Sequence, residues 1–174
     1  MINKLIALIV VGVFFVVGCN ENPVEEKFEG NTFTSINVKE GLTDYFDFSS
    51  NTADTTGESG WDIAFTAISW SPAPEAPTIW DPYIIGNENI TVARVNAMEL
   101  SEVTDIPEEG FTANFNTQAD AWYETDGSFI VVPLDYVYVV NTDDGKYPAF
   151  EIVNYYDNEG NSGVFTIHWK YLSE

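Results

Sequence analysis

The sequence predicts an all-β protein with antiparallel sheets in a single domain. Short runs of β-branched and aromatic residues recur along the chain and are bounded by clusters of Gly, Asn, Asp and Pro, the pattern of strands and turns. Hydrophobic residues make up 45% of the chain and aromatic residues 15%. This supply is enough for a substantial core without disulfides. No long amphipathic helix is evident.

The N-terminus has the layout of a secretory signal peptide. Lys4 is followed by an uncharged run from Leu5 to Val17. An apolar run of about 13 residues is shorter than the roughly 20 that a membrane-spanning helix needs. We therefore expect residues 1–18 to be a lipoprotein signal peptide that is cleaved.

The cleavage point is indicated by the four residues Val16-Val17-Gly18-Cys19. This order of an apolar residue, a further residue, a small residue and a cysteine resembles the lipobox of bacterial lipoproteins. Cys19 is the one cysteine of the chain, so it has no partner for an internal disulfide. We expect lipid attachment at Cys19. The alternative is an ordinary signal peptide with an incidental cysteine.

The segment after the cysteine is polar and acidic and contains Pro23, so it cannot bury enough apolar surface to fold. We expect residues 19–30 to form a lipidated flexible tether and residues 31–174 to form one folded domain. Acidic residues directly after a lipidated cysteine also resemble the export signal of Bacteroidetes lipoproteins. The expected location is therefore the outer membrane, lipid-anchored and on the cell surface. A periplasm-facing position is the alternative.

Within the domain, seven strands are expected, at residues 31–38, 60–68, 90–95, 128–133, 136–141, 149–156 and 163–171. The last three should form a C-terminal meander, because Asp144-Gly145 is a strong hairpin signal. In the final strand, alternation places Phe165, Ile167, Trp169 and Tyr171 on the core face. The same alternation places His168 on the more polar face.

Two segments, 49–60 and 69–89, are expected to be irregular. The second holds four of the eight prolines together with Trp70, Trp80 and Tyr83. Because proline fixes φ, it lowers the entropy cost of ordering an exposed loop. Such a loop would present its aromatic side chains to a ligand. The alternative is that the three aromatics cap one end of the β structure.

Charge and residue counts exclude several classes of function. The chain has 28 acidic and 6 basic residues, a formal net charge of -22, and is too acidic for a nucleic-acid partner. A single histidine and a single cysteine argue against paired-histidine metal chemistry and a thiol nucleophile, and the Gly-x-Ser-x-Gly elbow is missing. We expect no catalytic residues and no enzyme activity. The calcium-loop pattern is also missing, so no metal site is predicted.

Two motifs of the chain are similar to those of a known family: Trp61-Asp-Ile-Ala-Phe65, and Val137-Tyr-Val-Val-Asn-Thr-Asp-Asp-Gly-Lys-Tyr147. Together with the lipoprotein signal, they make the chain resemble the HmuY family of haem-binding lipoproteins, which occurs mainly in Bacteroidetes. The resemblance covers Phe33 to the C-terminus. It implies an HmuY-like β domain that captures haem outside the cell and passes it to a TonB-dependent outer-membrane receptor.

The ligand set implied by the family cannot be reproduced here. The founding member holds haem iron between two histidines in the middle of the domain, whereas this chain has His168 alone. The remaining candidates for haem binding are Met98, His168 and Tyr83 as iron ligands, with Trp80 and Trp70 as aromatic contacts. The alternative function is a non-enzymatic lipoprotein module that binds a glycan or a protein partner and has lost haem ligation.

Overall fold

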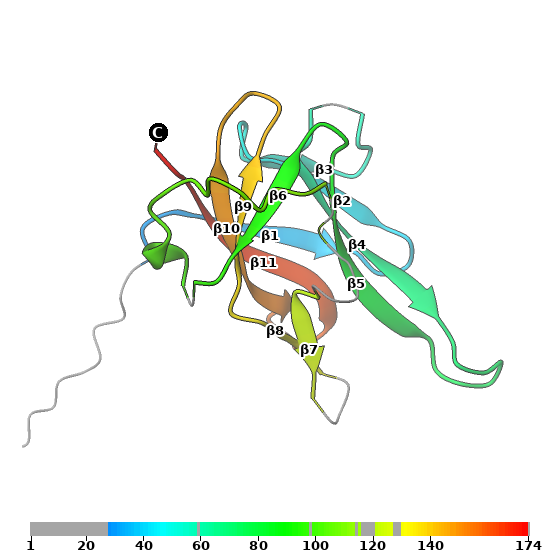
Figure 1. The fold of residues 1–174 in the computed structure, drawn as a ribbon. Helices are drawn as coiled ribbons and strands as arrows, with labels where there is room; N and C mark the ends of the chain where they lie inside the picture. Colours follow the sequence, from blue (N-terminus) through cyan, green and yellow to red (C-terminus); the bar gives the residue numbers. More distant parts are fainter. Residues whose placement is uncertain are drawn as a thin grey trace, which may run out of the picture.

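Two antiparallel sheets face each other across one aromatic core (Figure 1). The computed structural model describes residues 28–58, 60–97, 99–113, 115, 121–126 and 130–173. The predicted all-β class with antiparallel sheets is confirmed. The first sheet has five strands, in the spatial order β1 (Asn31–Asn37), β11 (Ser162–Tyr171), β10 (Pro148–Tyr156), β9 (Val137–Asn141) and β6 (Thr91–Val95).

The predicted C-terminal meander is confirmed in this sheet. Strands β9, β10 and β11 are antiparallel neighbours, with Phe150 opposite Tyr138 on one side and opposite Trp169 on the other. Strand β1 pairs with the free side of β11, where Phe33 lies opposite Ile167. The end of the chain therefore forms the centre of the sheet.

The second sheet has four strands, in the order β3 (Thr52–Asp54), β2 (Thr43–Asp47), β4 (Ile63–Trp70) and β5 (Ile79–Gly86). A separate hairpin joins β7 (Tyr123–Thr125) to β8 (Val131–Pro133), and the short 3-10 helix η1 covers Leu100–Glu102. None of the helical structure in the described ranges is long and apolar enough to cross a membrane.

Two loop predictions were wrong. The segment 49–60 contains β3, and the segment 69–89 contains the end of β4 and all of β5. Its prolines suggested a loop because proline cannot donate to a strand ladder. However, β5 is an edge strand, which tolerates proline, and Pro82 is buried opposite Ala67. Within this segment, the connection 71–78 and residues 87–89 are irregular.

The main core consists of aromatic side chains from both sheets. Phe65 of β4 meets Phe165 of β11 with ring centroids 4.9 Å apart, and Phe46 of β2 meets Trp169 edge-on at 6.1 Å. Aromatic pairs of this kind add about 0.5–1.5 kcal/mol to the stabilisation from their buried area. The face of β11 that was predicted to be buried carries Phe165, Ile167 and Trp169, all at most 2% exposed. Tyr171 was predicted to share this buried face, but it lies at the end of the strand and is 39% exposed.

A second apolar cluster lies on the outer face of the five-stranded sheet. It comprises Leu100, Val103, Val137, Val139, Ala149 and Leu172. The segment that contains η1 covers this part of the sheet, and Phe28 packs against the same cluster. A strand covered on both faces is apolar at consecutive positions, which explains why all four residues of Val137-Tyr-Val-Val140 are buried.

Two buried carboxylates support the chain where strands end. Asp62 Oδ2 accepts a hydrogen bond of 2.9 Å from the Phe48 N–H, and Asp44 Oδ2 accepts one of the same length from the Ile36 N–H. Burial raises the pKa of Asp62 to about 6, and burial also raises the pKa of Asp44. The aspartate of the Trp61–Phe65 motif is therefore a structural residue.

Candidate functional site

A cavity of about 720 Å³ lies on the outer face of the five-stranded sheet, beside the second apolar cluster. We call it the histidine cavity; its lining includes Phe28, Glu29, Glu99, Leu100, Glu151, His168 and Lys170. Strands β10 and β11 form its floor, and η1 and the start of the described chain form its walls. It contains the single histidine of the protein.

Strand alternation points His168 into this cavity. Its neighbours Ile167 and Trp169 face the main core, and Glu151 lies directly opposite His168 on β10. His168 Nδ1 is 3.4 Å from Glu151 Oε1, while Glu151 Oε2 accepts a 2.8 Å hydrogen bond from the Leu100 N–H. Glu151 therefore ties the imidazole to η1. The other ring nitrogen, Nε2, takes no part in that ion pair.

The face of the imidazole is covered by Phe28. The two rings stack with centroids 4.3 Å apart and planes inclined by 10°. Gly30 permits this arrangement, because a Cβ there would overlap the Phe28 ring and lie 2.8 Å from the Trp169 carbonyl oxygen. The segment just before β1 is thus held against β11. This contact was not predicted, because Phe28 lies in the segment that was expected to be a flexible tether.

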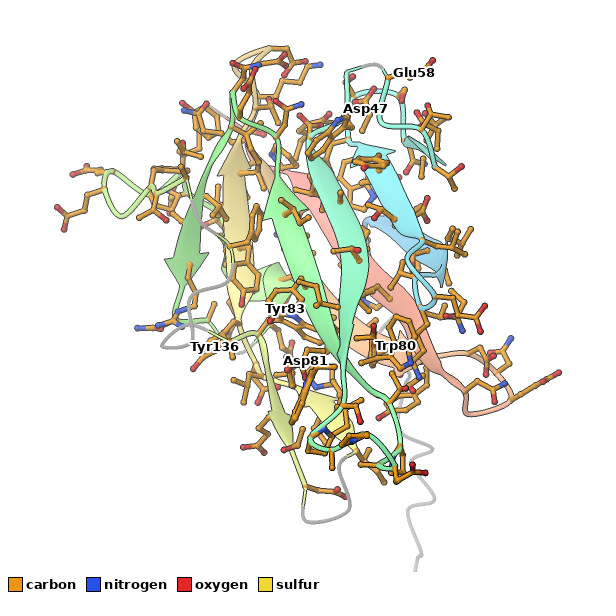
Figure 2. The ribbon with its side chains drawn as sticks, turned by 90° about the vertical axis from the view of Figure 1, so that its right-hand side faces the viewer. Asp47, Glu58, Trp80, Asp81, Tyr83 and Tyr136 are labelled. Atoms are coloured by element: carbon orange, nitrogen blue, oxygen red, sulfur yellow. The ribbon has the colours of Figure 1, made fainter. Side chains whose placement is uncertain are left out.

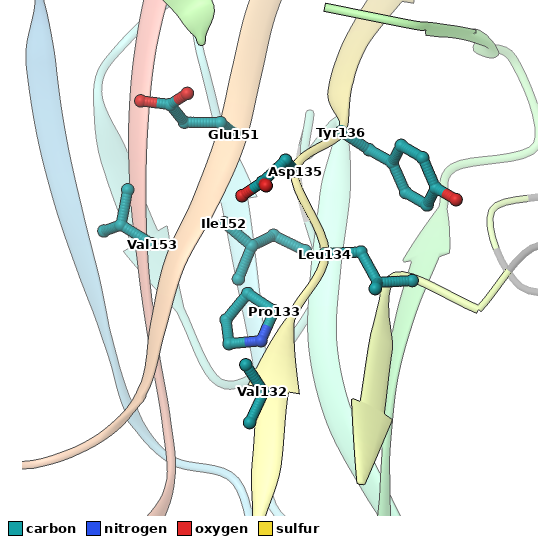
Figure 3. A pocket seen from close by; sticks show the side chains of 8 residues that line it. All are labelled: Val132, Pro133, Leu134, Asp135, Tyr136, Glu151, Ile152 and Val153. Atoms are coloured by element: carbon teal, nitrogen blue, oxygen red, sulfur yellow. The ribbon is translucent and has the colours of Figure 1, made fainter. Parts of the chain in front are cut away.

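A smaller groove of about 370 Å³ adjoins the histidine cavity and shares Glu151 with it. Figure 3 shows Glu151 at one end of this groove and Val132 at the other, with Asp135 and Tyr136 along one side. The guanidinium carbon of Arg94 lies 4.5 Å from the centre of the Tyr136 ring, a cation–π contact.

The other aromatic candidates lie on the hairpin formed by β4 and β5. Trp80 points inward and packs against the main core, whereas Trp70, Asp81 and Tyr83 lie on the outer face (Figure 2). Trp70 is 46% exposed, and its Nε1 donates a 2.8 Å hydrogen bond to Asp81 Oδ2. The sequence did not identify Asp81, although alternation along β5 would have placed it beside Tyr83.

Tyr123, the first residue of β7, interacts electrostatically with Asp81 and Tyr83. Burial raises the pKa of Tyr123, and the charges of Asp81 and Tyr83 raise it further. The next ring, Trp122, is fully buried and lies 4.9 Å from the Tyr123 ring. An ionised tyrosine is therefore disfavoured at position 123.

The structure separates the predicted ligand candidates into two places. His168 lies in the histidine cavity, while Trp70 and Tyr83 lie on the outer face of the other sheet, with the main core between them. His168 and Tyr83 therefore cannot bind one iron together. Met98 and Cys19 lie outside the described residues, although Glu99, the residue after Met98, lines the histidine cavity.

No preformed cluster of three or more His, Cys, Asp or Glu side chains suited to a metal ion occurs among the described residues. The carboxylates of Glu29, Glu99 and Glu151 line the histidine cavity, but they are not arranged as a metal-binding group.

Several solved structures have a fold similar to that of this chain. No protein-family model and no curated protein matches the sequence. Among solved structures, the apo form of an HmuY analogue from Tannerella forsythia superposes with a TM-score of 0.63 at 13% identity, covering 84% of this chain and 97% of that chain. A Bacteroides fragilis protein described as a lipoprotein gives 0.61 at 16% identity, with 87% and 94% covered.

A third structure has a more specific description. A Bacteroides vulgatus protein described as HmuY-like and haem-binding superposes with a TM-score of 0.60 at 17% identity, covering 83% of this chain and 93% of that chain. In each case nearly all of the neighbour is matched by residues of the present chain. The resemblance inferred from the two sequence motifs is confirmed at the level of the fold: this chain has an HmuY-like fold.

Proposed function

We propose that the protein is a non-enzymatic, lipid-anchored haem-binding protein that acts outside the cytoplasm and takes part in haem uptake. The observation that carries this proposal is the HmuY-like fold, which extends over more than nine-tenths of each of the three neighbours. Two of these neighbours are described by reference to HmuY and one of the two as haem-binding. Haem, or a related tetrapyrrole, is accordingly the proposed ligand.

The histidine cavity fits a haem ligand in three respects. Haem iron accepts an imidazole as an axial ligand. His168 Nδ1 faces Glu151, an arrangement that orients a metal-binding imidazole and leaves Nε2 to bind the metal. The cavity volume of about 720 Å³ lies in the range of small-molecule sites, about 300–1,000 Å³. His168 would hold the iron, and bound haem would supply the tetrapyrrole chemistry.

The charges around the cavity define how the ligand would be oriented. Lys170 is the cation of the lining, two residues beyond His168 on the same face of β11. The carboxylates of Glu29, Glu99 and Glu151 repel the haem propionates. Lys170 would hold the negative charge of the propionates, and Leu100 and Phe28 would contact the apolar part of the group.

The ligand set would differ from the two histidines of the family's founding member. His168 is the one histidine of the chain, so two histidines of the same chain would not hold the group here. Met98, which lies outside the described residues, stays a candidate from the sequence.

The test is a haem titration of purified residues 20–174, in ferric and ferrous states, followed through the Soret and visible bands. We expect a saturable one-to-one shift that is lost in His168→Ala and weakened in Met98→Ala. Tyr83→Phe is the matched control and should leave the spectrum unchanged. Loss of the shift in Tyr83→Phe alone would move the haem to the hairpin. The absence of any saturable shift would remove the haem function and leave the fold.

Attachment and partner form the second part of the proposal. Cys19 would carry the lipid, and the partner would be a TonB-dependent outer-membrane receptor. Support comes from the lipobox-like residues and from the B. fragilis neighbour described as a lipoprotein. Expression of Cys19→Ser should leave an uncleaved precursor that takes up no labelled palmitate. Normal processing of that variant would contradict lipid anchoring, and failure of a purified receptor to bind the haem-loaded protein would contradict the partner.

A further inference from the structure

The outer face of the β4–β5 hairpin carries a row of side chains that neither the fold nor the proposed haem site uses. In the strand register, Trp70 lies opposite Ile79, Ile68 opposite Asp81, and Thr66 opposite Tyr83. These residues share one face because side chains alternate along each strand. Ile79 and Tyr83 are four positions apart, so the row is about 14 Å long. Figure 2 looks onto this hairpin and labels Asp81 and Tyr83.

One end of the row is a tryptophan held in a fixed orientation. Trp70 is 46% exposed, yet its Nε1 is already bonded to Asp81 at 2.8 Å. Because the N–H is occupied, the ring presents its faces to a ligand. Neighbouring aliphatic side chains are also exposed, Ile68 by 56% and Ile85 by 47%. Exposed apolar side chains gathered on one face indicate an interaction site.

The other end of the row is hollowed. A cavity of about 230 Å³ is lined by Thr66, Ile68, Tyr83, Ile85 and Phe115, among others. The face therefore combines an aromatic ring at one end, a carboxylate in the middle, and a hollow with a phenol hydroxyl at the other end. The carboxylate of Asp81 and the hydroxyl of Tyr83 alternate here with apolar side chains, which distinguishes this face from a continuous apolar docking face.

This alternation fits a sugar chain. A pyranose ring has a face of C–H groups, which stack on the negative face of an aromatic ring, and an edge of hydroxyl groups, which donate to a carboxylate such as Asp81. The net charge of -22 and the central position of Asp81 disfavour anionic sugars. We propose that the outer face of the β4–β5 hairpin, from Trp70 to Tyr83, binds a neutral oligosaccharide.

The experiment uses the purified protein and four neutral probes: cellotetraose, xylotetraose, mannotetraose and chitotetraose. Binding is measured by isothermal titration calorimetry and by chemical-shift changes of the Trp70 indole. We expect at least one probe to bind with a millimolar or lower Kd. Trp70→Ala should weaken that binding by about tenfold, and Trp70→Phe should restore part of it. Circular dichroism verifies that both variants are folded.

Controls separate this site from the histidine cavity and from a peptide site. His168→Ala should leave sugar binding unchanged, because the main core lies between the two regions. Because β5 is an edge strand, an extended peptide is the competing occupant, and a synthetic Thr-Val peptide tests it. The proposal is overturned if none of the four sugars binds, if Trp70→Ala binds as well as the wild type, or if the peptide alone perturbs Trp70.

Discussion

The histidine cavity and the outer face of the β4–β5 hairpin both lie on outer sheet faces, yet they differ in what covers them. Over β10 and β11, η1 and Phe28 pack against the sheet and enclose a cavity around His168. In the part of the chain that the structure describes, no such segment encloses Trp70, which is 46% exposed. Figure 1 shows η1, in green at the left, well away from the hairpin at the right. The covering segment, rather than the strand itself, decides whether a polar side chain lines a cavity or an open surface.

The largest loss in the free energy of unfolding is expected from changing a side chain that faces the main core, rather than one on an outer sheet face. Phe165 is fully buried, with its ring 4.9 Å from Phe65 and 5.1 Å from Trp122. Phe165→Ala should lower the free energy of unfolding by about 3–5 kcal/mol, measured by urea denaturation. Trp70→Ala, on the open face, should cost about 1 kcal/mol or less. Equal losses would show that Trp70 supports the fold as much as Phe165 does, and would contradict the distinction between the two residues.

A smaller effect is expected from opening the covered region. Gly30→Ala places a Cβ against the Phe28 ring and the Trp169 carbonyl, so Phe28 should leave its stack on His168. We expect a loss of about 1–3 kcal/mol in the free energy of unfolding. The imidazole resonances of His168, measured by NMR, should lose the ring-current shift from Phe28. Phe28→Ala is the control that removes the stack without a clash; unchanged His168 resonances in both variants would contradict the contact.

The stability of the fold should depend on pH through Asp62, which lies outside both the histidine cavity and the outer face of the β4–β5 hairpin. Because the pKa of Asp62 is raised to about 6, the folded protein keeps this proton where the unfolded chain, with a pKa of about 4, has lost it. The contribution to stability is therefore present at low pH and is lost as the pH rises from about 4 to about 6.

Asp62→Asn removes this titration and keeps an oxygen for the Phe48 N–H. Relative to the wild type, the variant should become more stable as the pH rises through that range and constant above it. Urea unfolding at several pH values measures the difference. A difference that does not vary with pH would show that Asp62 has an ordinary pKa in the folded state.

The smallest change in stability is expected at the ion pair within the cavity. The His168 and Glu151 side chains are 29% and 20% exposed, so Glu151→Gln should change the free energy of unfolding by about 1 kcal/mol or less. A glutamine oxygen can still accept from the Leu100 N–H. Haem affinity should fall more than stability, because the orientation of the imidazole is lost. An unchanged haem affinity would separate Glu151 from the ligand site.

Much of the fold could be predicted because alternation and turn residues are local signals. The meander and the two faces of β11 follow from the sequence between Val137 and Tyr171. Strand β5 could not be predicted, because its prolines resemble a loop until its position at a sheet edge is known. The neighbours of His168 could not be predicted either: Glu151 is set by strand register, and Phe28 by a bend of the chain at Gly30.

The stack of Phe28 on His168 also fixes where the chain leaves the domain. If Cys19 carries the lipid, it lies nine positions before Phe28, a reach of at most about 30 Å. The histidine cavity, which Phe28 lines, would then stay within about that distance of the lipid headgroups.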